Sequence, residues 1–395
     1  MRTRVAAAGV ILAGLALPIV QATPATAADG GTYAYVVNQD TDDVAVIDTT
    51  TNAPVPGTPV TVGDAPNGVA ANPAGTRVYV TNGIGNSVSV IDATANPPVV
   101  IHTVTVGTGP TAVAVSPDGT RVYVTNSDGT VSVIDATANP PVVIHTVNVG
   151  TSPTAVAVSP DGTRVYVTVD TALVDTVSVI DATANPPVVI GPPIVLLGIS
   201  NPRAVAFNPL GTRAYVANSA SGNVSVINTT TNPPLVIATV PTLGSTPSGV
   251  AVNPAGTRFY VTNQGSQTVS VFDASATPPA VIGLPTPLPA NSAPWGVAVN
   301  PAGTSVYTAN TGLAPGVGMS VIDTLTRTTV GAPVPTGGTD PRAVAVVAVP
   351  GTATAQCPPG PSTALTGGGF EITGPFPNYF NSKPVINDTW QISGT

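Results

Sequence analysis

Residues 119–126 read Gly-Thr-Arg-Val-Tyr-Val-Thr-Asn, and residues 131–135 follow with Val-Ser-Val-Ile-Asp. Apolar and polar positions alternate in both runs, which is typical of β-strands. The same pair of runs occurs seven times at a spacing of 43 to 49 residues, with its tyrosine at Tyr35, Tyr79, Tyr123, Tyr166, Tyr215, Tyr260 and Tyr307. A period of this length with several short strands in each copy predicts an all-β, seven-bladed β-propeller.

Each copy contains four candidate strands. In the second copy we expect them at residues 68–71, 77–81, 87–91 and 99–106. A turn such as Ser-Pro-Asp-Gly at 116–119 joins the first strand of a copy to its second, because proline presets one turn angle and glycine accepts a positive φ. The sequence therefore predicts seven four-stranded blades over residues 28–351.

The phase of the repeat predicts how the ring closes. The first copy starts at its second strand, residues 33–37, and the last copy ends with a lone first strand, residues 343–347. We expect this last strand to become the innermost strand of the first blade, which leaves no open sheet edge. Residues 352–395, which contain the chain's single cysteine, Cys357, are interpreted as a short C-terminal extension, a truncated β module.

The N-terminus is typical of a secretion signal. Arg2 and Arg4 precede an apolar run at residues 5–20, and residues 25–27 read Ala-Thr-Ala, a small-x-small cleavage pattern. The run is shorter than the ~20 residues that usually span a membrane. We therefore expect cleavage of residues 1–27 and a secreted or cell-surface protein with no membrane span.

Composition limits the partners and the chemistry. Only 8% of the residues are charged and the formal net charge is −8, so the chain lacks the basic surface that nucleic acids and anionic lipids require. A single cysteine excludes an internal disulfide. The predicted propeller contains no Glu, Lys or Cys. We expect a monomer that binds no nucleic acid.

The recurring Tyr-Val-Thr-Asn at 79–82 and 123–126, with Val-Ser-Val-Ile-Asp and Ser-Pro-Asp-Gly, resembles the YVTN-type β-propeller repeat of surface-layer and secreted proteins. The resemblance covers residues 32–349 and departs at Val169 and Asn228. It implies a fold similar to lactonases, to the large subunit of quinoprotein amine dehydrogenases and to haem d1 nitrite reductases. Fold alone transfers none of these activities.

Residues that recur in every copy are interpreted as scaffold. His102 and His145 occupy one position in consecutive copies, and no third histidine exists to complete a metal or haem site. An acidic or amide residue closes the third strand of each copy and is predicted to accept backbone hydrogen bonds in the next turn: Asp48, Asp92, Asp135, Asp181, Asn228, Asp273 and Asp323. The sequence accordingly predicts no cofactor, no metal and no catalytic residue in this framework.

Residues that differ between copies are the candidates for function. The residue after each first-strand proline is expected at the mouth of the central channel, and these positions hold Asn67, Thr111, Thr154, Arg203, Ser248, Trp295 and Arg342. Arg203, Trp295 and Arg342 depart from the small polar pattern and are suited to an acidic or sugar-like ligand. The alternative is rim packing, with Arg342 paired to Asp340. The longest loops expected on this face are 170–176 and 311–318.

Two main functions follow from these observations, and a small-ligand sensor at the Trp295 mouth is a third. The main interpretation is a non-catalytic scaffold that binds a protein or a cell-envelope carbohydrate through Asn67, Arg203, Trp295, Arg342, Asp64 and Asp340. The alternative is a lactonase-like hydrolase with Asp64 and Asp340 at the channel, where the resemblance implies carboxylates that often hold a hard metal ion. The carboxylates outside the repeating framework are Asp40, Asp42, Asp43, Asp64, Asp128, Asp170, Asp175 and Asp340.

Overall fold

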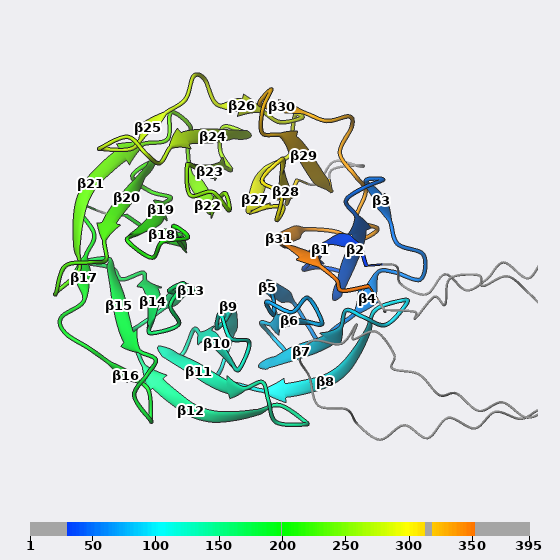
Figure 1. Ribbon diagram of the computed structural model, residues 1–395, viewed down its shortest axis with the longest axis horizontal. Coiled ribbons are helices and arrows are strands. Elements are labelled where there is room, and N and C mark those ends of the chain that lie inside the picture. The colour runs from blue at the N-terminus through cyan, green and yellow to red at the C-terminus, as the bar shows by residue number, and fades with distance from the viewer. Residues whose placement is uncertain (1–29, 199, 313–317, 352–395) are drawn as a thin grey trace, which may run out of the picture. The chain divides into compact units, whose positions relative to one another are not determined.

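The computed structural model describes residues 30–198, 200–312 and 318–351, and these form seven antiparallel sheets arranged as the blades of a propeller (Figure 1). The predicted secretion signal (1–27) and C-terminal extension (352–395) lie outside the described residues. Within the described part there is no helix long and apolar enough to cross a membrane. The predicted seven-bladed, all-β architecture is confirmed.

From the channel outward, the strands of each blade follow the order of the chain, except that the last strand of the chain comes first in blade 1. Blade 1 contains β31 (Pro341–Ala348), β1 (Thr32–Asn38), β2 (Asp43–Asp48), β3 (Ala53–Pro54) and β4 (Val60–Thr61); blade 2 contains β5 (Pro66–Ala71), β6 (Arg77–Asn82), β7 (Ser87–Asp92) and β8 (Val99–Thr105); blade 3 contains β9 (Pro110–Val115), β10 (Arg121–Asn126), β11 (Thr130–Asp135) and β12 (Val142–Asn148); blade 4 contains β13 (Pro153–Val158), β14 (Arg164–Val169), β15 (Thr176–Asp181), β16 (Val188–Val189) and β17 (Ile194–Val195).

Blades 5 to 7 repeat this order. Blade 5 contains β18 (Pro202–Phe207), β19 (Arg213–Asn218), β20 (Asn223–Asn228) and β21 (Leu235–Pro241); blade 6 contains β22 (Pro247–Val252), β23 (Arg258–Asn263), β24 (Thr268–Asp273), β25 (Ala280–Val281) and β26 (Thr286–Pro287); blade 7 contains β27 (Pro294–Val299), β28 (Ser305–Asn310), β29 (Met319–Asp323) and β30 (Thr328–Thr329).

The ring closes through the predicted latch in blade 1. Strand β31 pairs antiparallel with β1, in a register that places Tyr33 opposite Val347 and Tyr35 opposite Ala345. Strand β31 also contacts the innermost strands of both adjacent blades, β27 and β5. The first and last strands of the propeller are therefore hydrogen-bonded neighbours in one sheet, and the expected closure is confirmed.

The tyrosine of each repeat fills the space between blades. All seven tyrosines are at most 2% exposed. Tyr123 of β10, for example, belongs to one apolar cluster with Val165 and Val167 of the next blade. Burial of an apolar side chain contributes roughly 1.5–3 kcal/mol, so the repeated tyrosine and valines stabilise every blade-to-blade contact.

The threonine and asparagine that follow the tyrosine satisfy buried polar groups. The innermost strand is irregular after its proline, and the Thr81 hydroxyl accepts a hydrogen bond (2.8 Å) from the Gly68 N–H at this point. Buried Asn82 donates through Nδ2 to the Ser87 and Ser89 hydroxyls (2.9 and 3.0 Å). In blade 4 the apolar Val169 replaces this asparagine, and the Ser178 hydroxyl donates instead to the Val149 carbonyl (2.7 Å).

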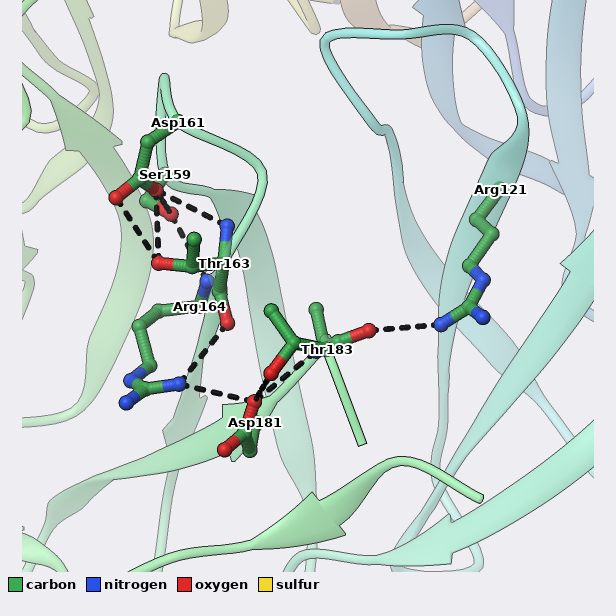
Figure 2. Close-up of polar contacts among 8 residues, drawn as sticks. Arg121, Ser159, Asp161, Thr163, Arg164, Asp181 and Thr183 are labelled. Carbon is green, nitrogen blue, oxygen red and sulfur yellow. Dashed lines mark hydrogen bonds and ion pairs between the residues drawn. The ribbon is translucent and has the colours of Figure 1, made fainter. Parts of the chain in front are cut away.

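The polar ends of the strands join turns to strands and blades to blades (Figure 2). Asp181 Oδ1 accepts a hydrogen bond from the Thr183 N–H (3.0 Å) and pairs with Arg164 Nη1 (2.9 Å). Arg121 of the preceding blade donates to the Ala182 carbonyl (2.8 Å). The predicted role of the strand-closing Asp residues as acceptors in the turn is confirmed.

The outermost strands differ from the prediction in four blades. In blades 2, 3 and 5 the outer strand is continuous, whereas in blades 1, 4, 6 and 7 only two-residue segments pair with the third strand. Prolines interrupt the outer segment in these four blades, for instance Pro192 and Pro193 in blade 4. A proline lacks the N–H that continues the sheet ladder. The two histidines lie on continuous outer strands, and His102 Nε2 lies 3.1 Å from Asn139 Oδ1 of the next blade.

Removal of a buried asparagine tests the role of the repeated motif. We expect Asn82→Ala to lower the free energy of unfolding by about 1–3 kcal/mol, because the hydroxyls of Ser87 and Ser89 lose a buried partner. Urea denaturation followed by tyrosine fluorescence measures the change. Thr50→Ala, at an exposed position in a turn of blade 1, is the control and should change stability by less than about 0.5 kcal/mol.

Candidate functional site

The innermost strands of the seven blades surround a recess of about 260 Å³ at the channel mouth. The residue after each first-strand proline lines it, as the sequence predicted: Asn67, Thr111, Thr154, Arg203, Ser248, Trp295 and Arg342. Four of the six predicted site residues, Asn67, Arg203, Trp295 and Arg342, are thus brought together from blades 2, 5, 7 and 1.

A repeated backbone conformation places these side chains. The residue before each first-strand proline has a positive φ of 41° to 61°, and only one of the seven is glycine: Ala65, Gly109, Ser152, Asn201, Thr246, Ala293 and Asp340. This conformation is costly for a residue with a Cβ atom. The adjacent loop holds it through a hydrogen bond, such as Gly83 N–H to Ala65 O at 2.8 Å. Each chain segment therefore enters the channel through a sharp, fixed turn.

Small polar residues of the mouth connect neighbouring blades. The hydroxyls of Thr111, Thr154 and Ser248 donate to the carbonyl of the proline at the start of the next blade, at distances of 3.2, 2.6 and 2.9 Å. These three side chains are therefore committed to the ring. The larger side chains at the mouth, which include Arg203 and Trp295, are therefore the ones that can determine what the recess binds.

Trp295 lies between two guanidinium groups. Arg342 Cζ is 4.8 Å and Arg203 Cζ is 5.7 Å from the centroid of the indole ring. Gly296 lets the backbone of β27 lie close to that of β31, because a Cβ atom there would lie 2.9 Å from the Arg342 carbonyl oxygen. Cation–π contacts of this kind contribute about 0.5–2 kcal/mol each, so the indole orients both guanidinium groups.

The two arginines are not equivalent in charge. Arg342 forms an ion pair with Asp340, with 2.9 Å from Nε and 2.7 Å from Nη2 to Oδ2. Within the described residues, the exposed Arg203 makes no hydrogen bond or ion pair. The mouth therefore offers an unpaired fork of N–H donors beside an aromatic face, which suits a carboxylate or a phosphate.

Asp170 and Asp175, in the loop after the second strand of blade 4, form a carboxyl pair, and the charge of Arg203 acts on Asp170. The carboxylate of Asp175 is 3% exposed and accepts hydrogen bonds from the N–H groups of Thr171, Ser200 and Asn201 (2.8–2.9 Å). These bonds keep the pKa of Asp175 below its usual value although burial opposes them. Burial and the adjacent Asp175 charge raise the pKa of Asp170, against the attraction of Arg203.

The structure gives the predicted carboxylates different places. Asp340 lies at the mouth, held by Arg342. Asp64 is exposed and lines a separate recess with Asp40 and Asp42. The carboxylate that lies near Arg203 is Asp170, which was not among the predicted site residues. The sequence feature that could have identified Asp170 is its charge. At the same repeat position, directly after the second strand, the other blades have uncharged residues: Gln39, Gly83, Ser127, Ser219, Gln264 and Thr311.

The metal ion implied by the resemblance to lactonases does not fit this mouth. A hard divalent cation needs several oxygen ligands, whereas Asp340 is engaged by a guanidinium. Among residues 30–198, 200–312 and 318–351 no group of three or more His, Cys, Asp or Glu side chains is placed to hold a metal. The loop predicted at 311–318 lies mostly outside the described residues.

Comparisons with known proteins agree with the fold. Residues 93–236 match the family model described as lactonase, 7-bladed beta-propeller. A functionally unknown protein of Desulfotomaculum acetoxidans is 18% identical, with a TM-score of 0.68 over 80% of this chain and 99% of that chain. The periplasmic gluconolactonase of Pseudomonas aeruginosa is 18% identical, with a TM-score of 0.62 over 81% and 100%. The hydrazine synthase of Kuenenia stuttgartiensis is 24% identical, with a TM-score of 0.62 over 73% and 92%.

No curated protein matches the chain. These solved structures are all under 25% identical, so their similarity establishes the lactonase-like propeller fold. The surface-layer association expected from the sequence motif stays a prediction.

Two substitutions in the carboxyl pair are expected to have opposite pH dependence. A raised pKa means that Asp170 favours the folded state when protonated, and this contribution is lost as the pH rises above 3.8 through the raised pKa. Asp170→Asn should therefore gain stability relative to the wild type as the pH rises. Asp175→Asn should lose about 1.5–3 kcal/mol at neutral pH and approach the wild type below pH 3.8. Urea denaturation from pH 3 to pH 8 measures both; parallel curves would contradict the assignment.

Proposed function

We propose that this protein is a lactonase-like hydrolase that binds the anionic group of a lactone at the channel mouth. The observation that carries the proposal is the placement of Trp295 between Arg203 and Arg342 in one recess. The indole holds the guanidinium groups at the recess through cation–π contacts, and guanidinium groups bind a carboxylate or phosphate. The family-model match over residues 93–236 and the fold similarity to a gluconolactonase support the lactonase class.

The chemistry requires a base close to the bound ester. A water molecule adds to the acyl carbon, its proton passes to a base, and the ring oxygen then leaves and takes a proton. Asp170 is our candidate for the base, because it is a half-buried carboxylate exposed to the charge of Arg203, and burial and Asp175 raise its pKa.

This proposal replaces the non-catalytic scaffold as the main interpretation, because the comparisons favour the lactonase alternative. Asp64 is exposed and lines a separate recess with Asp40 and Asp42, so our proposal takes Asp170 in its place. The expected secretion signal at residues 1–27 leads us to place the enzyme outside the cytoplasm. A mouth that binds an acidic saccharide without turnover would instead support the scaffold.

The role of Arg203 in binding is tested by a loss of activity that is confined to anionic substrates. We expect the protein to hydrolyse an anionic sugar lactone, uronic or phosphorylated, faster than neutral gluconolactone. Arg203→Gln should lower kcat/KM for the anionic lactone by about 10- to 100-fold, the value of one charged hydrogen bond, and change turnover of the neutral lactone little. Rates are measured by pH-stat and corrected for spontaneous hydrolysis. An equal loss for both lactones would contradict anion binding at Arg203.

A second pair of variants tests the base. Asp170→Asn should lower kcat by about 10²- to 10⁴-fold, with little change in the binding of a non-hydrolysable acidic sugar. Asp64→Asn removes an exposed carboxylate outside the mouth and should leave turnover unchanged. Loss of turnover in Asp64→Asn, with full activity in Asp170→Asn, would return the base to the position expected from the sequence.

A further inference from the structure

The groove between blades 1 and 2 lacks a side chain that five other blades possess; blade 7, with Ser305, lacks it too. In blades 2 to 6 the second strand begins with arginine, at Arg77, Arg121, Arg164, Arg213 and Arg258. In blade 1 the same position holds Tyr33, opposite Asp48 on β2. The substitution removes a cation from a place where the rest of the molecule repeatedly has one.

The guanidinium of this arginine has a small set of partners in the other blades. Arg77 and Arg164 pair with the Asp of their own third strand, at 3.2 and 2.9 Å. Arg121 reaches the carbonyl of Ala182 in the next blade, as Figure 2 shows. Arg213 and Arg258 likewise reach the next blade, where they donate to the carbonyls of Ala274 and Thr324 (3.0 and 2.8 Å). These guanidinium groups therefore bind either a carboxylate or a backbone carbonyl beside the next blade.

The groove in blade 1 retains these partners without the cation. It has a volume of about 390 Å³ and is lined by Tyr33, Tyr35 and Asp48 of blade 1 and by Ala93 of blade 2, which corresponds to Ala182. Asp48 accepts a hydrogen bond from the Thr50 N–H (2.7 Å) and has no arginine partner within the described residues.

A buried hydroxyl without a partner in the described residues belongs to a residue that lines the same groove. The ring of Tyr35 is fully buried, and its hydroxyl has no hydrogen-bond partner in the part of the chain that the structure describes. In blades 3 and 5 the arginine two residues earlier lowers the pKa of the corresponding tyrosines, Tyr123 and Tyr215, against the effect of burial. In blade 6 the Tyr260 hydroxyl is without a partner in the described residues although Arg258 is present. An unsatisfied buried polar group costs about 1–3 kcal/mol, so a donor that entered the groove would recover this energy.

The groove between blades 4 and 5 shows the filled arrangement. It is lined by Arg164, Tyr166 and Asp181, which correspond to Tyr33, Tyr35 and Asp48. There the guanidinium lies 2.9 Å from the carboxylate. Two grooves of the same construction thus differ in whether the chain supplies its own cation.

We propose that the groove between blades 1 and 2 binds a guanidinium group supplied from outside the propeller. The group pairs with the Asp48 carboxylate, donates to the Tyr35 hydroxyl and the Ala93 carbonyl, and lies against the Tyr33 ring. A free small guanidine and an arginine side chain of a peptide share this chemistry. This site is independent of the channel mouth and of the proposed hydrolase activity.

Titration of the full chain with methylguanidinium tests the site. We expect saturable binding by calorimetry with a Kd on the order of 1 mM, since a small cation gains little beyond one ion pair and its hydrogen bonds. Methylammonium at the same ionic strength should bind at least about 10-fold more weakly, because it lacks the planar fork of donors. Absence of saturable binding, or equal affinity for the two cations, would overturn the proposal.

Two variants copy arrangements that the molecule already contains. Tyr33→Arg reproduces the sequence of blades 2 to 6 and should abolish binding because the groove fills itself. Asp48→Asn copies Asn228 of blade 5, whose Oδ1 accepts from the Thr230 N–H (3.0 Å), so the turn is preserved while affinity falls at least about 10-fold. Asp135→Asn, the same change in blade 3, is the control. Unchanged binding in Asp48→Asn, or equal loss in Asp135→Asn, would place the cation elsewhere.

The two sources of the guanidinium are separated by a comparison of ligands. A blocked tripeptide Gly-Arg-Gly is titrated beside methylguanidinium into the wild type and Asp48→Asn. Tighter binding of the peptide, lost in the variant, identifies an arginine side chain as the natural ligand. Tighter binding of methylguanidinium, also lost in the variant, identifies a small guanidine. Binding of the peptide that Asp48→Asn does not weaken would contradict the proposal.

Discussion

Every blade of this propeller is apolar on both faces, and this constraint determines the rest of the structure. A sheet with two apolar faces is stable only between two others, so the blades must form a closed ring. The pairing of β1 with β31 completes that ring, and it places the innermost strand of blade 1 beside those of blades 2 and 7. The circular arrangement in turn directs seven equivalent residues, Trp295 among them, toward one recess.

The periodicity of the sequence was sufficient to predict the fold because each repeated residue has a local task. Tyr79 fills the space between two blades. The Thr81 hydroxyl accepts the hydrogen bond of a backbone N–H in the irregular innermost strand, and Asn82 joins two strands through its side chain. The residues expected at the channel mouth were predictable for the same reason, since they follow a proline at a fixed place in each copy. The broken outer strands were not predicted, because the effect of proline depends on which N–H groups the neighbouring strand requires.

Contacts between loops that are distant in the sequence could not be predicted from the sequence. The expectation that Asp64 and Asp340 share a site rested on their places in adjacent loops, whereas one is exposed and the other is paired with Arg342. Asp170 lies near Arg203 of the following blade, and only the folded ring shows this neighbour. The two arginines at the mouth and the missing arginine of blade 1 are all departures from the repeat. The identical residues of the repeats build the framework, whereas a single substitution gives one blade different chemical groups.

The latch in blade 1 also imposes an order in time. A ribosome synthesises β1 first and β31 last, separated by more than 300 residues, yet the two strands share one sheet. Blades 2 to 7 each draw all their strands from one continuous stretch of chain, so each is available for pairing as soon as that stretch emerges. Blade 1 alone waits for the synthesis of β31, and until then β1 and β5 lack the neighbour that covers them. The junction between blades 1 and 2, which contains the arginine-free groove, is consequently among the last parts of the molecule to be completed.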